Sequence, residues 1–373
     1  MLAIASVAAL CYALIPLAGA MVRRRSWHSF RARAGALRLC PTLGFRSRAE
    51  LDPRAAPAGA FRFFGEAESL GEDGVLFARG SGLSIPVLMK GAEAYLLSAK
   101  SESPEDWREA PDSGEEAVQR IGWKKALEIA EGSRVFVGGS LARLDGRLCF
   151  AAGEESPLLV IFHDGPDRRL LPGIAWAGRC RGEYFNRATP YSLALGAVSL
   201  LFIAAYYLPY QAFRQTSIAA IIAAFAPLFP LLPTGFPFTL AYRRLARAAR
   251  ALRARRDLAR LPLRYPAGEL PDGEIYGSVL VAELPPEAGI PLLAPEAAKR
   301  PARVYGALRA EGALPTLPAD PLAPFGALPA DVRAFAKRCA AKACASEALA
   351  WIALLSGIAL TFFFIGLLTF VLS

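Results

Sequence analysis

Four long stretches of this chain carry no charged side chain, and they constrain its fold more than any other feature. They cover residues 2–20, 191–210, 217–241 and 348–373. An α-helix rises about 1.5 Å per residue, so about 20 residues cross the hydrocarbon core of a bilayer, which is about 30 Å thick. A buried core helix could explain one such stretch, but not four together. The sequence therefore predicts four transmembrane helices, at residues 1–21, 191–211, 217–241 and 348–372.

The charged residues predict how these helices are oriented. Charged residues make up 20% of the chain, and the formal net charge is +10. The basic residues nearest the apolar stretches are Arg23, Arg24, Arg25, Arg243, Arg244, Arg247, Lys337, Arg338 and Lys342. Loops rich in Lys and Arg stay on the cytoplasmic side of a membrane. The prediction is a multi-pass protein of the cell (inner) membrane, with residues 22–190 and 241–347 in the cytoplasm and both termini outside.

The first apolar stretch allows a second interpretation. Ala18, Gly19 and Ala20 form the small-residue pattern of a signal-peptidase site. A cleaved signal carries its positive charge before the apolar run, whereas here three arginines follow it. This order favours an uncleaved anchor, and a cleaved signal is the alternative.

An arginine-rich segment follows the third apolar stretch, and we interpret it as a helix over residues 242–261. On a helical wheel most of its arginines share one side, which is typical of a helix on an anionic lipid surface. The residues expected to contact anionic lipid headgroups are Arg243, Arg244, Arg247, Arg250, Arg253 and Arg260. Nucleic acid is not an expected partner, because no aromatic residue for base stacking lies between Tyr242 and Tyr265.

The third apolar stretch contains four prolines, Pro227, Pro230, Pro233 and Pro237. Each internal proline removes a helix hydrogen bond, and a freed carbonyl in lipid needs a partner within the protein. The stretch is therefore predicted to be a kinked helix packed against the other spans. A broken helix lining a transport site is the alternative.

The first soluble region begins with a basic segment, residues 22–58, predicted to be a tether with at most one basic helix. Short apolar runs separated by turn residues then predict a β-rich domain at residues 59–188, and Asp145-Gly146 is typical of a hairpin. The runs EGSRVFVGGSLARLDGRLCF and PLLVI resemble the β-rich module of GIDE-type membrane proteins and the OB-like barrels of NfeD-type membrane proteins, over residues 60–190. The resemblance implies a five-stranded barrel and supplies no catalytic residue.

The second soluble region, residues 262–330, is rich in proline. Ten prolines fall between Pro285 and Pro329, a density that argues against a regular sheet and favours an irregular segment. Asp331 is placed to cap a helix over residues 331–347 that leads directly into the last apolar stretch.

The sequence predicts no catalytic, cofactor-binding or metal-ligating residue. The six cysteines form no CxxC pair, and His163-Asp164 stands alone at a strand end, where a turn residue is the ordinary interpretation. The predicted fold is an α+β membrane protein with four transmembrane helices, a cytoplasmic OB-like barrel and a proline-rich segment. Its expected function is non-enzymatic, as a membrane-anchored scaffold for an unknown cytoplasmic protein. The alternatives are a membrane-associated hydrolase or transferase, and an accessory subunit of a transporter or channel.

Overall fold

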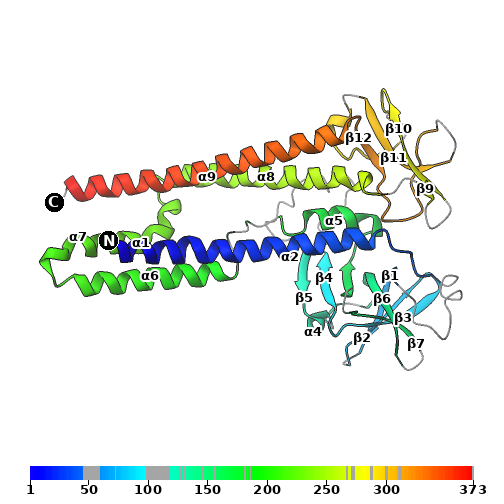
Figure 1. The fold of residues 1–373 in the computed structure, drawn as a ribbon, viewed down its shortest axis with the longest axis horizontal. Coiled ribbons are helices and arrows are strands. Elements are labelled where there is room, and N and C mark those ends of the chain that lie inside the picture. Colours follow the sequence, from blue (N-terminus) through cyan, green and yellow to red (C-terminus); the bar gives the residue numbers. More distant parts are fainter. Residues whose placement is uncertain are drawn as a thin grey trace. The chain divides into compact units, whose positions relative to one another are not determined.

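The structure is a computed structural model in which the chain forms two compact units. The helical unit comprises Met1–His28, Gly178–Arg253 and Arg338–Ser373, and the soluble unit comprises Ser29–Ala177 and Ala254–Lys337. Figure 1 shows the elements of both. The residues described are 1–44, 59–71, 73–97, 118–126, 128–129, 131–144, 147–153, 157–179, 182, 184, 186–265, 268–269, 274–285, 289–298, 301–309 and 313–371.

The helical unit contains the four membrane-spanning candidates that the sequence predicts. The helices long and apolar enough to cross a membrane are Leu2–Leu37, Ala188–Tyr207, Gln211–Leu231 and Val332–Leu368. The first is a continuous run of α1 (Leu2–Ala8), the π-helix η1 (Ala9–Leu14) and α2 (Ile15–Leu37), the second is α6 (Ala188–Tyr207), and the last is α9 (Val332–Val371). Asp331 caps α9 as expected, because its Oδ1 accepts from the Ala334 amide at 2.8 Å.

The third span is not the single kinked helix predicted for residues 217–241. It begins with η4 (Gln211–Phe213) and α7 (Arg214–Phe225), continues as the 3₁₀-helix η5 (Ala226–Leu231), and ends before α8 (Phe236–Leu263). The four prolines all lie at or beyond Pro227, so α-helical hydrogen bonding cannot continue past Phe225. The arginine-rich segment at 242–261 is consequently not a separate helix, since it continues from the apolar start of α8.

Side chains satisfy the backbone groups that prolines free in the helical unit. Pro16 has no N–H for the Tyr12 carbonyl, which instead accepts from the Tyr184 hydroxyl at 2.5 Å. The Pro16 carbonyl accepts from the Asn186 side-chain amide at 2.9 Å. At the break in the third span, the Thr239 hydroxyl donates to the Pro230 carbonyl at 2.8 Å. Bonds of this kind are what an apolar environment requires of a broken helix.

In the soluble unit, five strands close into the barrel that the sequence predicts. They are β1 (Ala60–Leu70), β2 (Val75–Gly80), β3 (Leu83–Leu88), β6 (Arg134–Leu144) and β7 (Arg147–Ala151). Their order is β1-β2-β3-β7-β6, and β1 pairs with β6 to close the ring. The β6–β7 hairpin joins Leu144 to Arg147, while its predicted turn, Asp145-Gly146, lies outside the described residues. Gly80 lets β1 and β2 approach closely, because a Cβ there would lie 2.1 Å from the Phe64 carbonyl oxygen.

The barrel core and its extension bury apolar side chains on both sides of β6. Phe63, Ile85, Val137 and Phe150 are fully buried inside the barrel. Beyond β6, the sheet continues through β8 (Leu159–His163), β4 (Glu93–Leu97) and β5 (Val118–Ile121). The short elements α4 (Trp123–Ala126), η3 (Asp167–Arg169) and α5 (Leu170–Trp176) complete this part.

The basic segment predicted as a tether at residues 22–58 is helical over its first part. α2 continues through it to Leu37, whose side chain packs on Gly138 of β6, where a Cβ would lie 2.6 Å away. The apolar contact, together with helix-forming Ala and Arg residues, extends the helix beyond the apolar stretch. Residues 45–58 lie outside the described residues.

The second soluble region contains a regular sheet, which corrects the irregular segment predicted for residues 262–330. The sheet has the order β12-β11-β10-β9, formed by β9 (Gly268–Glu269), β10 (Ile275–Val281), β11 (Ala302–Leu308) and β12 (Gly326–Pro329), with η7 (Pro295–Ala298) beside it. The ten prolines did not prevent this, because all but Pro329, the last residue of β12, lie outside the strands.

Candidate functional site

A buried ion pair joins the two halves of the soluble unit. Arg62 of β1 lies in the aromatic run Phe61–Phe64, and Asp320 lies 258 residues away between β11 and β12. The Arg62 Nη2 donates to the Asp320 Oδ2 at 2.8 Å, and the two side chains are 1% and 2% exposed. Buried charges of opposite sign interact strongly because little water screens them. We call this pair and the side chains around it the arginine junction: Arg38, Arg62, Tyr265, Tyr276 and Asp320.

Asp320 accepts several hydrogen bonds at the arginine junction. The Tyr265 hydroxyl donates to Oδ2 at 2.8 Å, and the Leu322 amide donates to Oδ1 at 3.0 Å. Burial and the Asp320 charge raise the pKa of Tyr265 well above its ordinary value, so this phenol stays protonated and donates. The carboxylate is thus fixed by a guanidinium, a phenol and a backbone amide.

Arg38, directly after α2, is the second buried arginine of the junction. Its Nη1 donates to the Leu261 carbonyl at 3.1 Å, and its guanidinium lies over the Tyr265 ring, 5.2 Å from the centroid. The residue is 2% exposed. Burial lowers the pKa of Arg38, although the guanidinium remains charged because arginine titrates far above neutral pH. Arg38 therefore joins the end of α2 to the last turn of α8 and to Tyr265 just beyond it.

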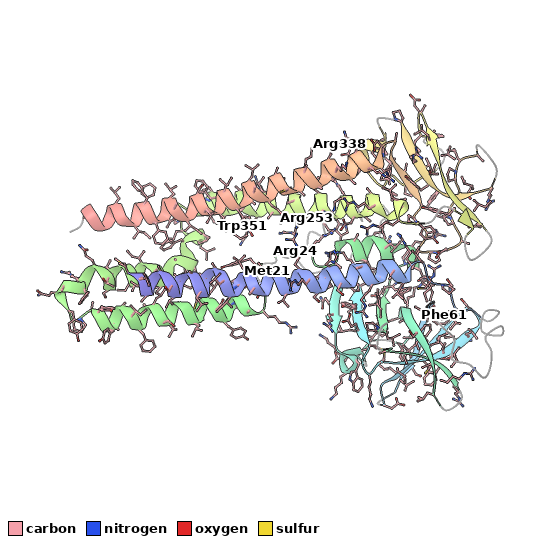
Figure 2. The ribbon with its side chains drawn as sticks, in the orientation of Figure 1. Met21, Arg24, Phe61, Arg253, Arg338 and Trp351 are labelled. Atoms are coloured by element: carbon pink, nitrogen blue, oxygen red, sulfur yellow. The ribbon has the colours of Figure 1, made fainter. Side chains whose placement is uncertain are left out.

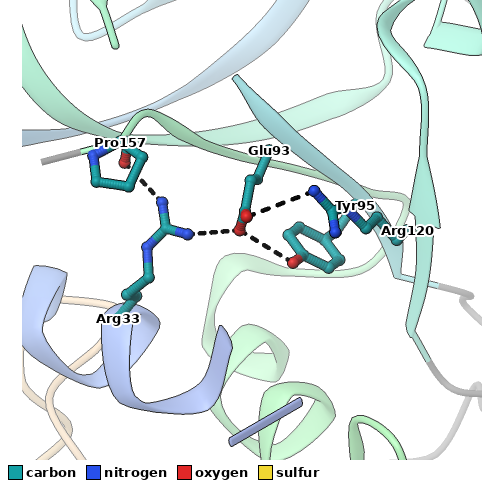
Figure 3. A network of polar contacts seen from close by, with 5 residues as sticks. All are labelled: Arg33, Glu93, Tyr95, Arg120 and Pro157. Atoms are coloured by element: carbon teal, nitrogen blue, oxygen red, sulfur yellow. Dashed lines mark hydrogen bonds and ion pairs between the residues drawn. The ribbon is translucent and has the colours of Figure 1, made fainter. Parts of the chain in front are cut away.

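A second polar network fastens α2 to the extension of the barrel (Figure 3). The Arg33 Nη1 lies 2.5 Å from the Glu93 Oε2, and its Nη2 donates to the Pro157 carbonyl at 2.8 Å. Glu93 also accepts from the Tyr95 hydroxyl at 3.1 Å and pairs with Arg120 at 3.5 Å. These side chains are partly exposed, so each bond contributes less than the buried pair.

His163, the histidine that the sequence analysis considered, is 2% exposed at the end of β8. Its Nδ1 lies 2.8 Å from the Gly165 carbonyl, and its Nε2 lies 3.4 Å from the Asp167 carboxylate. Burial lowers the pKa of His163, and the charge of Arg134 lowers it further, while the Gly165 carbonyl, Asp167 and Asp164 raise it by less. The ring is held neutral inside the fold and is not presented to a substrate.

The arginines expected to contact lipid fall into two groups. Arg243, Arg244 and Arg247 are exposed on α8, whereas Arg250, Arg253 and Arg260 are half-buried. Arg253 forms an ion pair with Glu347 of α9, and Arg260 belongs to the soluble unit. Figure 2 shows Arg24 and Arg253 at the same level along the helices. Tyr242 of α8 and Trp351 of α9 are also in contact, with ring centroids 5.9 Å apart.

The structure does not bring the sequence-predicted residues into one site. His163 and the α8 arginines belong to different clusters, and within the described residues no group of three or more His, Cys, Asp or Glu could hold a metal ion. Among the described residues, Cys11, Cys40, Cys149 and Cys344 are free thiols, and Cys180 lies outside the described residues. The sequence did not predict the arginine junction. The one sequence feature that could have indicated it is a charged residue, Arg62, within an aromatic strand.

Comparison of the chain with protein-family models, curated proteins and solved structures found no match.

Removing the acid of the buried pair should destabilise the soluble unit strongly. Asp320→Asn leaves the charge of Arg62 uncompensated, which costs about 3–5 kcal/mol for a buried pair. The measurement is thermal or denaturant unfolding of the full-length protein in detergent. Glu347→Gln is the control, because it breaks the partly exposed pair with Arg253 and should cost no more than about 1 kcal/mol. Equal losses in the two variants would contradict the role given to the junction.

His163 should make the fold sensitive to mild acid. Its folded pKa is below the unfolded value of about 6.5, so below that pH the unfolded chain binds a proton that the folded chain does not. Stability therefore falls as the pH drops from about 6.5 toward the folded pKa. Melting temperatures measured across this range should fall less steeply for His163→Gln than for the wild type. His28→Gln, at the exposed second histidine, should keep the wild-type slope. Identical slopes for His163→Gln and the wild type would refute this prediction.

Proposed function

We propose that this chain is a multi-pass membrane protein whose soluble unit is a non-enzymatic interaction module for a cytoplasmic protein. The observation that carries the proposal is the composite build of the soluble unit. Residues 29–177 and 254–337 supply a barrel and a second sheet, and the Arg62–Asp320 pair joins them. The chain crosses from one unit to the other four times, and three of these crossings lie within a helix. The helices are α2, α8 and α9. A folded surface attached to membrane helices at four points suits a protein that holds a partner at the membrane.

The proposal includes contact between the α8 arginines and anionic lipid headgroups. Aromatic side chains are enriched at the membrane–water interface, and the Tyr242–Trp351 pair would occupy that level. Arg243, Arg244 and Arg247 follow directly and are exposed, so their charges would reach the headgroups. Their position after an apolar segment also supports a cytoplasmic location for the soluble unit.

The geometry favours this proposal over the two alternatives. For a hydrolase or transferase, the candidate His163 would need to reach a substrate, but its ring is buried and bonded to the Gly165 carbonyl. For a transporter, the break in the third span would need polar groups free to bind cargo. The Thr234 and Thr361 hydroxyls instead bond each other at 2.9 Å, and Thr239 bonds the Pro230 carbonyl.

The interaction module can be tested by proximity labelling with the full-length chain. A labelling enzyme is inserted at Ser113 in one version and at Gly312 in another, in segments outside the described residues. Both versions should label one shared set of cytosolic proteins, because both segments are attached to one soluble unit. A version with the enzyme at the C-terminus, expected outside, should not label that set.

Two outcomes would count against the proposal. Labelling of exterior proteins from Ser113 would refute the cytoplasmic location. A set from Ser113 or Gly312 that matches the background of an unrelated membrane protein would refute the interaction module.

The lipid contact predicts a charge-specific effect in nanodiscs. The wild type should melt at a higher temperature in anionic than in neutral lipid, and added salt should reduce the difference. Replacing Arg243, Arg244 and Arg247 with Gln should remove most of it, since each basic residue near an anionic surface contributes about 1 kcal/mol. The control replaces Arg79, Arg147 and Arg309, three exposed arginines of the soluble unit, with Gln. If both triple variants lose the same amount, the contact is not at these arginines of α8.

A further inference from the structure

The arginine junction holds more positive charge than its own acid can neutralise. Arg38 and Arg62 are 2% and 1% exposed, and the buried acid among them is Asp320, at 3%. At the rim, the charges of Asp320 and, to a smaller extent, Glu274 act on the partly exposed Arg168, and Glu274 supplies the negative charge that offsets this third arginine. The described residues at the junction therefore bury a net charge of about one positive unit. Burying an uncompensated charge is strongly unfavourable, and such charges are normally paired.

The arginine junction also has more buried hydrogen-bond donors than acceptors. Asp320 uses one oxygen for Arg62 and Tyr265 and the other for the Leu322 amide. Three guanidinium nitrogens nevertheless are buried and have no hydrogen-bond partner among the described residues: the Nε of Arg38, and the Nε and Nη1 of Arg62. Of the four buried side-chain atoms without a partner among the described residues, these are three. Buried donors of this kind are rare in native proteins and call for an acceptor.

Both guanidinium groups lie close enough to Tyr265 for their charges to act on its hydroxyl. Arg38 lies over the Tyr265 ring, 5.2 Å from the centroid. Arg62 binds the carboxylate oxygen that also accepts from the Tyr265 hydroxyl. Tyr276 completes this side, with its ring 4.6 Å from that of Tyr265 and its hydroxyl donating to the Pro324 carbonyl at 2.8 Å. The phenols supply no negative charge here, so neither can balance the second arginine.

We propose that the arginine junction binds one small monovalent anion, of the size and charge of chloride, at the guanidinium groups of Arg38 and Arg62. One negative charge neutralises the excess, and the anion accepts from the donors that lack a partner. The site lies where residues 29–177 meet residues 254–337, so the anion binds only when both parts are folded together. It stabilises the soluble unit and is independent of the protein partner proposed above.

The test is an anion series with the full-length protein in detergent. Sodium chloride replaces sodium gluconate at constant ionic strength, because gluconate is too large for a buried site. The melting temperature should rise with chloride, and above the dissociation constant each tenfold increase in chloride should raise the apparent folding constant about tenfold. Arg38→Met should lose this increment, since it removes the excess charge and keeps the Arg62–Asp320 pair. Arg264→Gln, which removes an exposed charge next to Tyr265, should retain it.

A second measurement covers the case in which Arg38→Met does not fold. Bromide has a chloride-like charge and an anomalous X-ray signal, so crystals of the wild-type chain grown in bromide should show an anomalous peak within hydrogen-bonding distance of Arg38 or Arg62. Three results would overturn the proposal. These are no chloride effect in the wild type, a full effect in folded Arg38→Met, or a larger effect from phosphate than from chloride, which would assign the site to an oxyanion.

Discussion

The soluble unit depends on one buried ion pair, because its two parts come from segments that the helical unit separates in sequence. Arg62 and Asp320 are 258 residues apart, and the chain between them passes through the helical unit and back. If the parts separated, each would expose or strand a charge that is now paired and almost without solvent contact. A buried pair contributes little net stability compared with apolar side chains of the same volume, but breaking it is costly. The pair therefore makes the fully associated barrel and sheet more stable than any state in which the two are partly separated.

In the helical unit, buried backbone carbonyl groups are paired with hydrogen-bond donors, just as the buried charges are paired in the soluble unit. Pro16 removes a hydrogen bond within the continuous first helix, and prolines end α-helical hydrogen bonding in the third. The carbonyl groups freed in this way need partners within the protein if the surroundings are apolar. Tyr184 and Asn186, placed just before α6, supply donors to the first span, and Thr239 at the start of α8 supplies one to the third. Each donor lies in or next to a neighbouring helix. The hydrogen bonds that satisfy the freed carbonyl groups therefore also determine which helices pack together.

The parts of the fold that depend on local pattern were predictable from the sequence. Hydropathy identified four helices long and apolar enough to cross a membrane, and short apolar runs separated by turn residues identified a β-rich domain, because burial acts on neighbouring residues. Proline density misled in the second region, where Pro291 and Pro315 fall between strands and do not interrupt them. The prolines also led to the prediction of one kinked helix in the third stretch. A sequence shows where a helix is interrupted, but it does not show the direction of the chain after the interruption. The arginine junction could not be predicted, because its members are distant in sequence and ordinary in type.

The placement of Arg62 shows why such a site stays hidden until the fold is known. Between Phe61 and Phe63 an arginine on a strand points to the opposite face from its neighbours, and in an isolated barrel that face would be open to water. In the folded unit Asp320 and Tyr265 lie on this side, and Arg62 is buried, so a surface arginine becomes a charge that needs a fixed counterion. Arg38 follows α2 directly, and Tyr265 and Asp320 follow α8. Both helices begin within the apolar segments. The electrostatics of the soluble unit therefore depend on the path of the chain through the helical unit, and the barrel sequence alone does not contain them.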